Sequence, residues 1–217
     1  MTAPLLLERL RERTRPQHEA LDGVVPWGWA TTPERCRKLF GRYLGFYEPL
    51  ERRLAEVTRP EALSADEFSL GGSRSRFKTG ILKADLAALG ATEAEIAALP
   101  RCGRIPPLED AGAVVGAWYV TEGATLGGQY LARSLRERPG LTPETGAGFA
   151  SLYGDETGPR WKAFKRCGNA FGEANPAACN AAVETAAAMF AAFGDWFAAW
   201  TPAASEAAAP SAPGPDA

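Results

Sequence analysis

The sequence predicts an all-α protein with a single folded domain. Its 217 residues are 46% hydrophobic, which is enough for one substantial core but too little chain for two. In several segments apolar side chains recur at steps of three and four residues, the period of an amphipathic helix. No two segments show the paired alternation of a strand hairpin. We therefore expect a helical domain over residues 1–200 and a disordered Ala/Pro-rich tail over residues 201–217.

Charge and cysteine content exclude several classes of function. The formal net charge of −2 argues against a nucleic-acid-binding protein, which usually carries a basic face. The four cysteines are far apart and form no CxxC pair, so neither a zinc site nor a disulfide framework is indicated. The apolar stretch near the C-terminus contains Glu184 and Asp195, which favours a buried helix over a membrane span. We expect a cytoplasmic protein that binds neither nucleic acid nor membrane.

The first predicted helix, from about residue 5 to residue 22, carries the single histidine of the sequence. Leu10, Thr14 and His18 fall on one helical face, so the imidazole should point toward the core. Pro16 removes one backbone hydrogen bond and should bend or restart the helix near that point. A histidine on an apolar face is more often a hydrogen-bonded core residue than a ligand, and the spacing alone leaves both interpretations open.

Local signals place three more helices before residue 100. Thr32 is a candidate N-cap and Pro33 suits the first turn of a helix whose aromatic residues should lie in the core. A second helix should begin near residue 75 and stop at Gly90. Thr92 and Glu95 have the spacing of a capping box, which indicates a short third helix.

The next predicted helix, about residues 109–138, is unusually rich in glycine. Five interior glycines cost roughly 3–5 kcal/mol relative to alanine, so something should offset them. At about 100° per residue, Gly112, Gly116, Gly123 and Gly127 project within one narrow sector. The stripe could accommodate a closely crossing helix, or it could approach a planar ligand across a kink. A strand leading into a phosphate loop is disfavoured, because no lysine follows the glycines.

Two helices should complete the domain. The first follows Pro159, with Trp161 at core spacing and Lys162 and Arg166 among its basic residues. The second should be capped by Asn175, and its dense apolar face should close the core.

Two of these segments resemble the heme oxygenase family. The sequence Glu-Gly-Ala-Thr-Leu-Gly-Gly-Gln over residues 122–129 is similar to the glycine-bearing distal helix of the family, especially in bacterial members associated with bacteriophytochromes. The sequence Thr-Arg-Pro-Gln-His-Glu-Ala-Leu-Asp over residues 14–22 is similar to the proximal helix, whose histidine ligates heme iron. The resemblance covers roughly residues 5–200 and is specific at these two helices.

The resemblance implies an enzyme that cleaves heme to biliverdin, CO and ferrous iron, with heme sandwiched between the proximal helix and a kinked distal helix. Dioxygen is the oxidant, and electrons come from an external reductase or ferredoxin. A biliverdin-binding photoreceptor is a candidate partner. His18 would be the metal ligand, and the catalytic positions would be Gly123, Gly127 and Gly128, which leave room over the ring. The other cofactor-binding residues would be Arg11, Tyr119, Lys162 and Arg166.

The sequence departs from the family at one informative position. Ala124 stands where animal members carry an aspartate, so proton delivery must rely on water, Thr125 or a more distant group. Two other classes of function stay open. One is a non-catalytic heme carrier or sensor, or a thiaminase-like enzyme on a related fold. The other is a helical interaction module without a ligand.

Overall fold

Seven α-helices form most of the part of the chain that the computed structural model describes, residues 4–22, 24–57, 76–136 and 140–200. This part contains no β-strand, as the sequence predicts. The helices are α1 (Leu6–Asp22), α2 (Pro33–Glu56), α3 (Thr79–Ala88), α4 (Glu93–Ala98), α5 (Ala111–Arg136), α6 (Thr157–Ala174) and α7 (Cys179–Ala198). Short 3₁₀ turns connect several of them.

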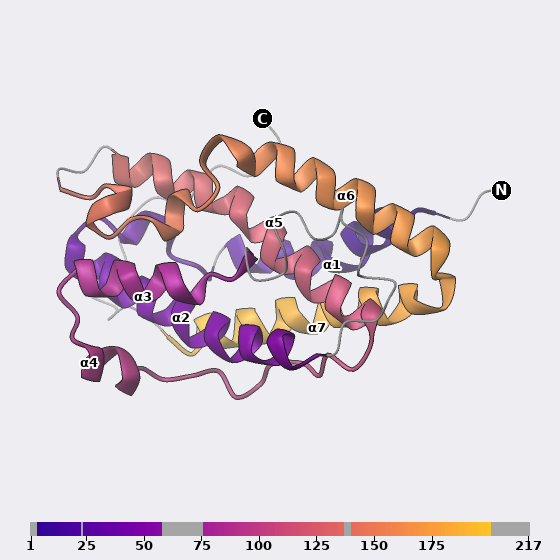
Figure 1. Ribbon diagram of the computed structural model, residues 1–217, viewed down its shortest axis with the longest axis horizontal. Coiled ribbons are helices and arrows are strands. Elements are labelled where there is room, and N and C mark those ends of the chain that lie inside the picture. Colours follow the sequence, from indigo (N-terminus) through magenta and orange to yellow (C-terminus); the bar gives the residue numbers. More distant parts are fainter. Residues whose placement is uncertain (1–3, 23, 58–75, 137–139, 201–217) are drawn as a thin grey trace.

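The longest helix, α5, runs through the middle of the molecule (Figure 1). It packs against α7 on one side and α6 on another, and α1 packs against the same two helices. Helix α2 packs mainly on α3. An aromatic cluster joins α2 to α7, because the Tyr43 ring lies 5.0 Å from that of Phe197 and the Phe46 ring lies 4.9 Å from that of Phe193. Helices α6 and α7 thus hold the His18 helix and the glycine-rich helix together.

The helix-start signals in the sequence are largely confirmed. The Thr32 side chain accepts a hydrogen bond from the Arg35 amide at 3.3 Å, and Thr92 and Glu95 form the predicted capping box. Gly90 follows α3 with a φ of 84°, a left-handed conformation that glycine adopts without strain. The N-terminus of α3 is capped from outside, because the Glu51 carboxylate on α2 accepts the Thr79 amide at 2.9 Å.

One expectation about a helix end is wrong. Asn175 does not cap α7; its side-chain nitrogen donates to the Phe171 carbonyl at 3.0 Å and so closes α6. A 3₁₀ turn over Pro176–Ala178 then leads into α7. Pro16 lies inside α1, which is continuous over Leu6–Asp22, so the helix does not restart there. The predicted tail, residues 201–217, lies outside the described residues. So do residues 1–3 of the predicted domain.

Helix α7 crosses α5 closely, and two glycines make this possible. A Cβ atom at Gly112 would overlap the carbonyl oxygen of Ala178, and one at Gly116 would overlap that of Ala182. In the described chain one segment, Pro176–Ala198, is long and apolar enough to cross a membrane. Nearly half of this segment is buried within the structure, where it packs against α5 and α1 as a core helix does.

Candidate functional site

His18 lies near the end of α1 and is exposed, so the prediction that it points into the core is wrong. Thr14 and Leu10, about one and two turns earlier on the same face, are buried. The imidazole contacts the ring of Phe190 on α7 edge-on, with centroids 5.9 Å apart and planes at 64°. Contact with Phe190 leaves part of the imidazole ring accessible. An accessible imidazole supported by an aromatic ring is able to ligate a metal.

Tyr119 connects α5 to α1. Its side chain is half-buried, and that burial raises the pKa of the hydroxyl, while a hydrogen bond with Thr14 and the nearby Arg11 guanidinium act in the opposite direction. Arg11 itself is exposed. The structure therefore brings together two of the predicted cofactor-binding residues, Arg11 and Tyr119, at the contact between the two helices.

The predicted catalytic glycines lie in the C-terminal half of α5. A Cβ atom at Gly123 would have its nearest neighbour, an indole carbon of Trp161, at 3.7 Å, and one at Gly128 would be 3.5 Å from the Ala150 carbonyl oxygen. Both are ordinary van der Waals distances, so protein packing does not require glycine at either position. Gly127 is exposed. The observed packing therefore does not explain why these positions are glycine.

The space for a planar ligand that the family resemblance implies beside the glycines is partly filled by side chains. The Trp161 indole from α6 lies against Gly123 and stacks on Phe164, with centroids 5.5 Å apart and planes at 7°. The Tyr119 ring also contacts this indole, with centroids 5.8 Å apart and planes tilted by 44°. Trp161, which the sequence spacing placed in the core, is half-buried and packs against the edge of the core beside Gly123.

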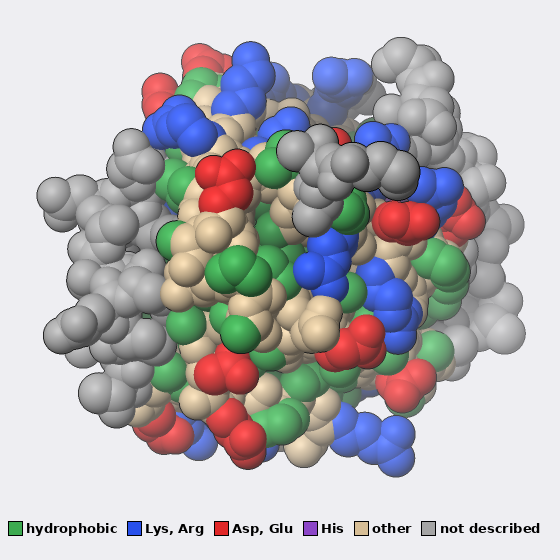
Figure 2. Space-filling model, turned by 90° about the vertical axis from the view of Figure 1, so that its right-hand side faces the viewer, with side chains coloured by type: hydrophobic (Ala, Val, Ile, Leu, Met, Phe, Trp, Pro, Cys, Tyr) green, Lys and Arg blue, Asp and Glu red, His purple; other side chains and the backbone are tan. Residues whose placement is uncertain are grey.

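The predicted basic residues of α6 are also at the surface. Lys162 and Arg166 are exposed, and Lys162 directly follows Trp161. Figure 2, which shows the right-hand end of the molecule in Figure 1, has lysine and arginine side chains interspersed with aspartate and glutamate. Positive charge is therefore not gathered into one broad patch on that face.

A buried charged cluster adjoins Gly123, and sequence reasoning missed it. Glu122 on α5 lies 3.0 Å from Nη1 of Arg76 and 3.6 Å from Nζ of Lys78, and all three side chains are 2% exposed. The Tyr153 hydroxyl donates to the same carboxylate at 3.2 Å. Burial lowers the pKa of Lys78, although Glu122 and Glu51 oppose that shift, and burial raises the pKa of Tyr153. The sequence signal that could have revealed this cluster is Glu122, a glutamate within an otherwise apolar stretch of the predicted helix.

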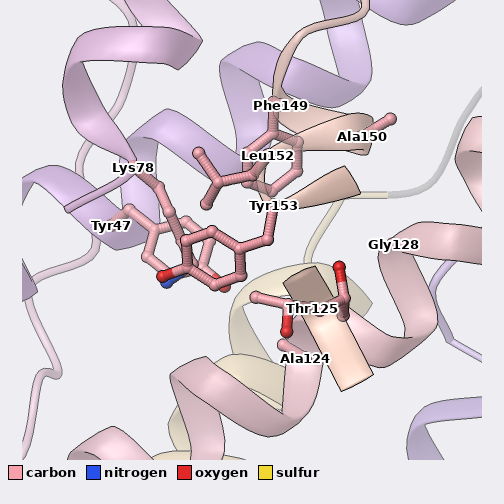
Figure 3. Close-up of a pocket in the computed structure, with 10 residues that line it drawn as sticks. Tyr47, Lys78, Ala124, Thr125, Gly128, Phe149, Ala150, Leu152 and Tyr153 are labelled. Atoms are coloured by element: carbon pink, nitrogen blue, oxygen red, sulfur yellow. The ribbon is translucent and has the colours of Figure 1, made fainter. Parts of the chain in front are cut away.

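A small cavity lies between this cluster and α5 (Figure 3). About 20 Å³ of it is open to the centres of water molecules, so it suits water and is far too small for a porphyrin. Figure 3 shows Lys78 and Tyr153 converging beside Tyr47, with Ala124 and Thr125 across the cavity. The full lining consists of Tyr47, Lys78, Ala124, Thr125, Gly128, Phe149, Ala150, Leu152, Tyr153 and Thr157.

Comparison with known proteins decides the family. A family model described as heme oxygenase matches residues 5–199, nearly the whole chain. The chain belongs to the heme oxygenase family. No curated protein and no solved structure is significantly similar to it. Membership of this heme oxygenase family implies heme as the ligand and supports a general role in heme binding or degradation, and the all-α architecture agrees with the family fold.

The residues of this heme oxygenase chain fit heme, with one adjustment. The accessible His18 imidazole is a suitable axial ligand, and Gly123 and Gly128 have no packing reason to lack a Cβ. Exposed Arg11, Lys162 and Arg166 could pair with the heme propionates. The adjustment concerns Trp161, whose ring occupies the position beside Gly123 and must shift or pack at the edge of the porphyrin.

Proposed function

We propose that this chain is a heme oxygenase enzyme that converts heme to biliverdin, CO and ferrous iron. Dioxygen is the oxidant, and the electrons come from a separate reductase or ferredoxin. The proposal places the protein in the cytoplasm, with a biliverdin-binding photoreceptor as a candidate consumer of the product. Family membership supports the heme ligand, and the site residues support the reaction.

The division of glycines within α5 carries the proposal. Gly112 and Gly116 are explained by the α7 backbone, whereas Gly123 and Gly128 have room for a methyl group. An interior glycine costs about 0.5–1 kcal/mol relative to alanine, and the second pair has no packing gain to offset that cost. A planar ligand lying against the helix backbone would explain why Gly123 and Gly128 are glycine. Tyr119 links this part of α5 to the helix that bears His18.

Each residue then has a definite task. Bound heme would supply an iron that activates dioxygen and the macrocycle that is cleaved. The His18 imidazole would hold that iron, steadied by its edge contact with Phe190. Gly123, Gly127 and Gly128 would leave space on the opposite side for dioxygen close to the ring. Arg11, Lys162 and Arg166 would fix the ring in its plane through the propionates, with Tyr119 beside Arg11.

Hemin titration followed by turnover tests the proposal. Purified protein should develop a strong Soret band at one equivalent of hemin. With an electron donor and oxygen, the band should decay as bile-pigment absorbance rises. A heme carrier or sensor would give the Soret band without the pigment, and an interaction module would give neither. A thiaminase-like enzyme would also fail to release pigment.

The His18→Ala variant assigns the ligand. We expect it to lose the histidine-ligated heme spectrum while keeping its helical circular dichroism, because an exposed side chain contributes little to the core. Added imidazole should restore the ligated spectrum, since position 18 is accessible. An unchanged spectrum in the variant would remove His18 from the site and with it the proposed orientation of heme.

A further inference from the structure

One face of α5 changes its neighbours halfway along the helix. At about 100° per residue, Gly116, Gly123 and Gly127 project within about 40° of one another. Tyr119 and Tyr130 fall on the same side of the helix. Helix α7 covers this face at Gly116, where a Cβ atom would overlap the α7 backbone. Further along, a Cβ atom at Gly123 would meet only an indole ring at an ordinary distance, and Gly127 is exposed. The face is therefore covered by a helix in its first half and largely uncovered in its second.

Two tyrosines stand at the ends of the uncovered part of this face. Tyr119 comes one turn before Gly123; it forms a hydrogen bond with α1, and its ring lies 5.8 Å from that of Trp161 on α6. Tyr130 comes three residues after Gly127, which is about 4.5 Å along the helix axis. The distance along the axis from Tyr119 to Tyr130 is about 16 Å at 1.5 Å per residue. The uncovered glycines thus lie between one tyrosine fixed by other helices and a second at the far end.

Tyr130 makes no hydrogen bond and no ring contact with another residue of the described chain. It is 38% exposed, one of three large hydrophobic side chains that are exposed in that part of the protein. A single exposed aromatic ring is ordinary on a protein surface, so its position is what matters. Helical side chains lean toward the N-terminus of their helix, and a side chain at position 130 therefore covers the turn that contains Gly127. The uncovered face ends at an aromatic ring that packs against no other described ring.

The chemistry of the two ends differs. The Arg11 guanidinium lies near Tyr119. Lys162 directly follows Trp161, which contacts Tyr119 as well. Two of the side chains proposed to pair with the propionates therefore gather at the Tyr119 end. Tyr130 offers an apolar ring with a hydroxyl that can stay in water. A heme with its propionates at the Tyr119 end would direct its opposite edge, which carries only methyl and vinyl groups, toward Tyr130.

We propose that Tyr130 is a specificity-determining residue of the heme site and selects hemes that carry only short substituents on the edge opposite the propionates. The inference rests on the proposed function and names the substrate class for it. The Tyr130 ring packs against the methyl and vinyl edge of the porphyrin and blocks a longer chain from passing along the face of α5. The same contact buries a ring that the protein alone leaves exposed, which favours binding of the short-chain heme.

Titration of the intact chain with two iron porphyrins tests the selection. One is hemin, and the other is hemin in which a farnesylated hydroxyethyl chain replaces one vinyl group, so both keep the iron and the propionates. Wild-type protein should bind the long-chain hemin at least about 10-fold more weakly, the low end of the discrimination that a close-fitting apolar site achieves. In Tyr130→Ala the two Kd values should become nearly equal, because a methyl group replaces the ring.

Two further variants separate the ring from other effects. Tyr130→Phe keeps the ring and removes the hydroxyl, so it should discriminate between the two hemins as wild type does. Gln129→Ala changes the neighbouring exposed residue, which lies about 120° from Gly123 around the helix, and is the matched control. It should keep the wild-type affinity for both hemins.

Fluorine NMR gives a readout that depends neither on turnover nor on a comparison of affinities. In protein labelled with 3-fluorotyrosine, the Tyr130 resonance is assigned by its loss in Tyr130→Phe. Gallium protoporphyrin, which is redox-inactive, should shift this resonance through the ring current of the porphyrin. The resonance of Tyr43, which is buried in the aromatic cluster between α2 and α7, should stay in place.

The outcomes distinguish this selection from the proposed function. If wild-type protein forms pigment but discriminates no better than Tyr130→Ala, or if the Tyr130 resonance does not shift, the selection is wrong and the proposed function stands. If Tyr130→Ala fails to fold, the NMR experiment on wild type decides. A larger loss of hemin affinity in Arg133→Ala than in Arg11→Ala would place the propionates at the Tyr130 end and overturn the selection.

The converse result is equally clear. If wild-type protein binds hemin selectively but forms no pigment, the enzyme assignment fails and the selection by Tyr130 stands. If wild-type protein binds no hemin at all, the proposed function fails, and the selection fails with it.

Discussion

The two halves of α5 use glycine for opposite reasons. In the N-terminal half, Gly112 and Gly116 let the α7 backbone approach so closely that a methyl group would overlap its carbonyl oxygens. In the C-terminal half, Gly123 meets only a tryptophan ring at an ordinary distance, and Gly127 is exposed. The single stripe of glycines in the sequence therefore comprises two features, a helix crossing and a group of glycines that the observed packing does not require.

The largest effect should come from the crossing. Gly116→Ala should destabilise the protein by about 3 kcal/mol, because the new Cβ would overlap the Ala182 carbonyl oxygen and push two core helices apart. For a chain of this size that corresponds to a fall in Tm of roughly 6–12 °C, measurable by thermal circular dichroism. A Tm equal to wild type would mean that α5 and α7 do not cross as described.

Gly127→Leu should affect catalysis and leave the fold alone. The position is exposed, so unfolding should be nearly unchanged. On the proposed function, the leucine side chain would fill the space for dioxygen and reduce pigment formation about 100-fold, or about 2.7 kcal/mol in activation free energy. Leu126→Ala, at the neighbouring exposed position, is the control for an altered surface. Normal turnover in Gly127→Leu would argue that this half of α5 does not cover the iron.

Gly123→Ala gives the sharpest contrast with Gly116→Ala. Without heme we expect it to stabilise the protein by about 0.5–1 kcal/mol, because alanine favours helix and its Cβ would meet Trp161 at 3.7 Å. Hemin affinity or turnover should fall in the same variant. Chemical denaturation of the heme-free protein measures the first effect. A loss of stability comparable to that of Gly116→Ala would erase the distinction between the two halves.

The smallest effect concerns Arg11. Its guanidinium is exposed, and an exposed ion pair contributes about 0.2–1 kcal/mol, so Arg11→Ala should weaken hemin binding by no more than about five-fold. The loss should shrink at high salt because the interaction is screened. Arg15→Ala, on the same helix, is the matched control, since Arg15 is also exposed. Equal affinity for wild type and Arg11→Ala would remove Arg11 from the propionate site.

Local signals explain why the fold could be predicted from the sequence. The capping box of Thr92 and Glu95 involves residues three positions apart, and helical periodicity extends over one segment at a time. The site depends on distant pairs that periodicity does not record. Tyr153 and Glu122 are 31 positions apart, and neither the exposure of His18 nor the contact of Trp161 with Gly123 follows from the helix that carries each residue. The family resemblance predicted that the helix bearing His18 and the glycine-rich helix act together. The buried cluster around Glu122 could be found only from the three-dimensional structure.

The indole that rests on Gly123 has a thermodynamic consequence for ligand entry. The ring already covers part of the helix at Gly123, so a porphyrin arriving there would exchange one aromatic cover for another and displace less water than it would from a bare helix. Because the heat-capacity change on association follows newly buried apolar area, calorimetry of wild-type protein should give a smaller negative ΔCp than the area of the ring suggests. Replacing Trp161 with alanine should make that ΔCp more negative, since the exposed patch would then be hydrated before the ring arrives.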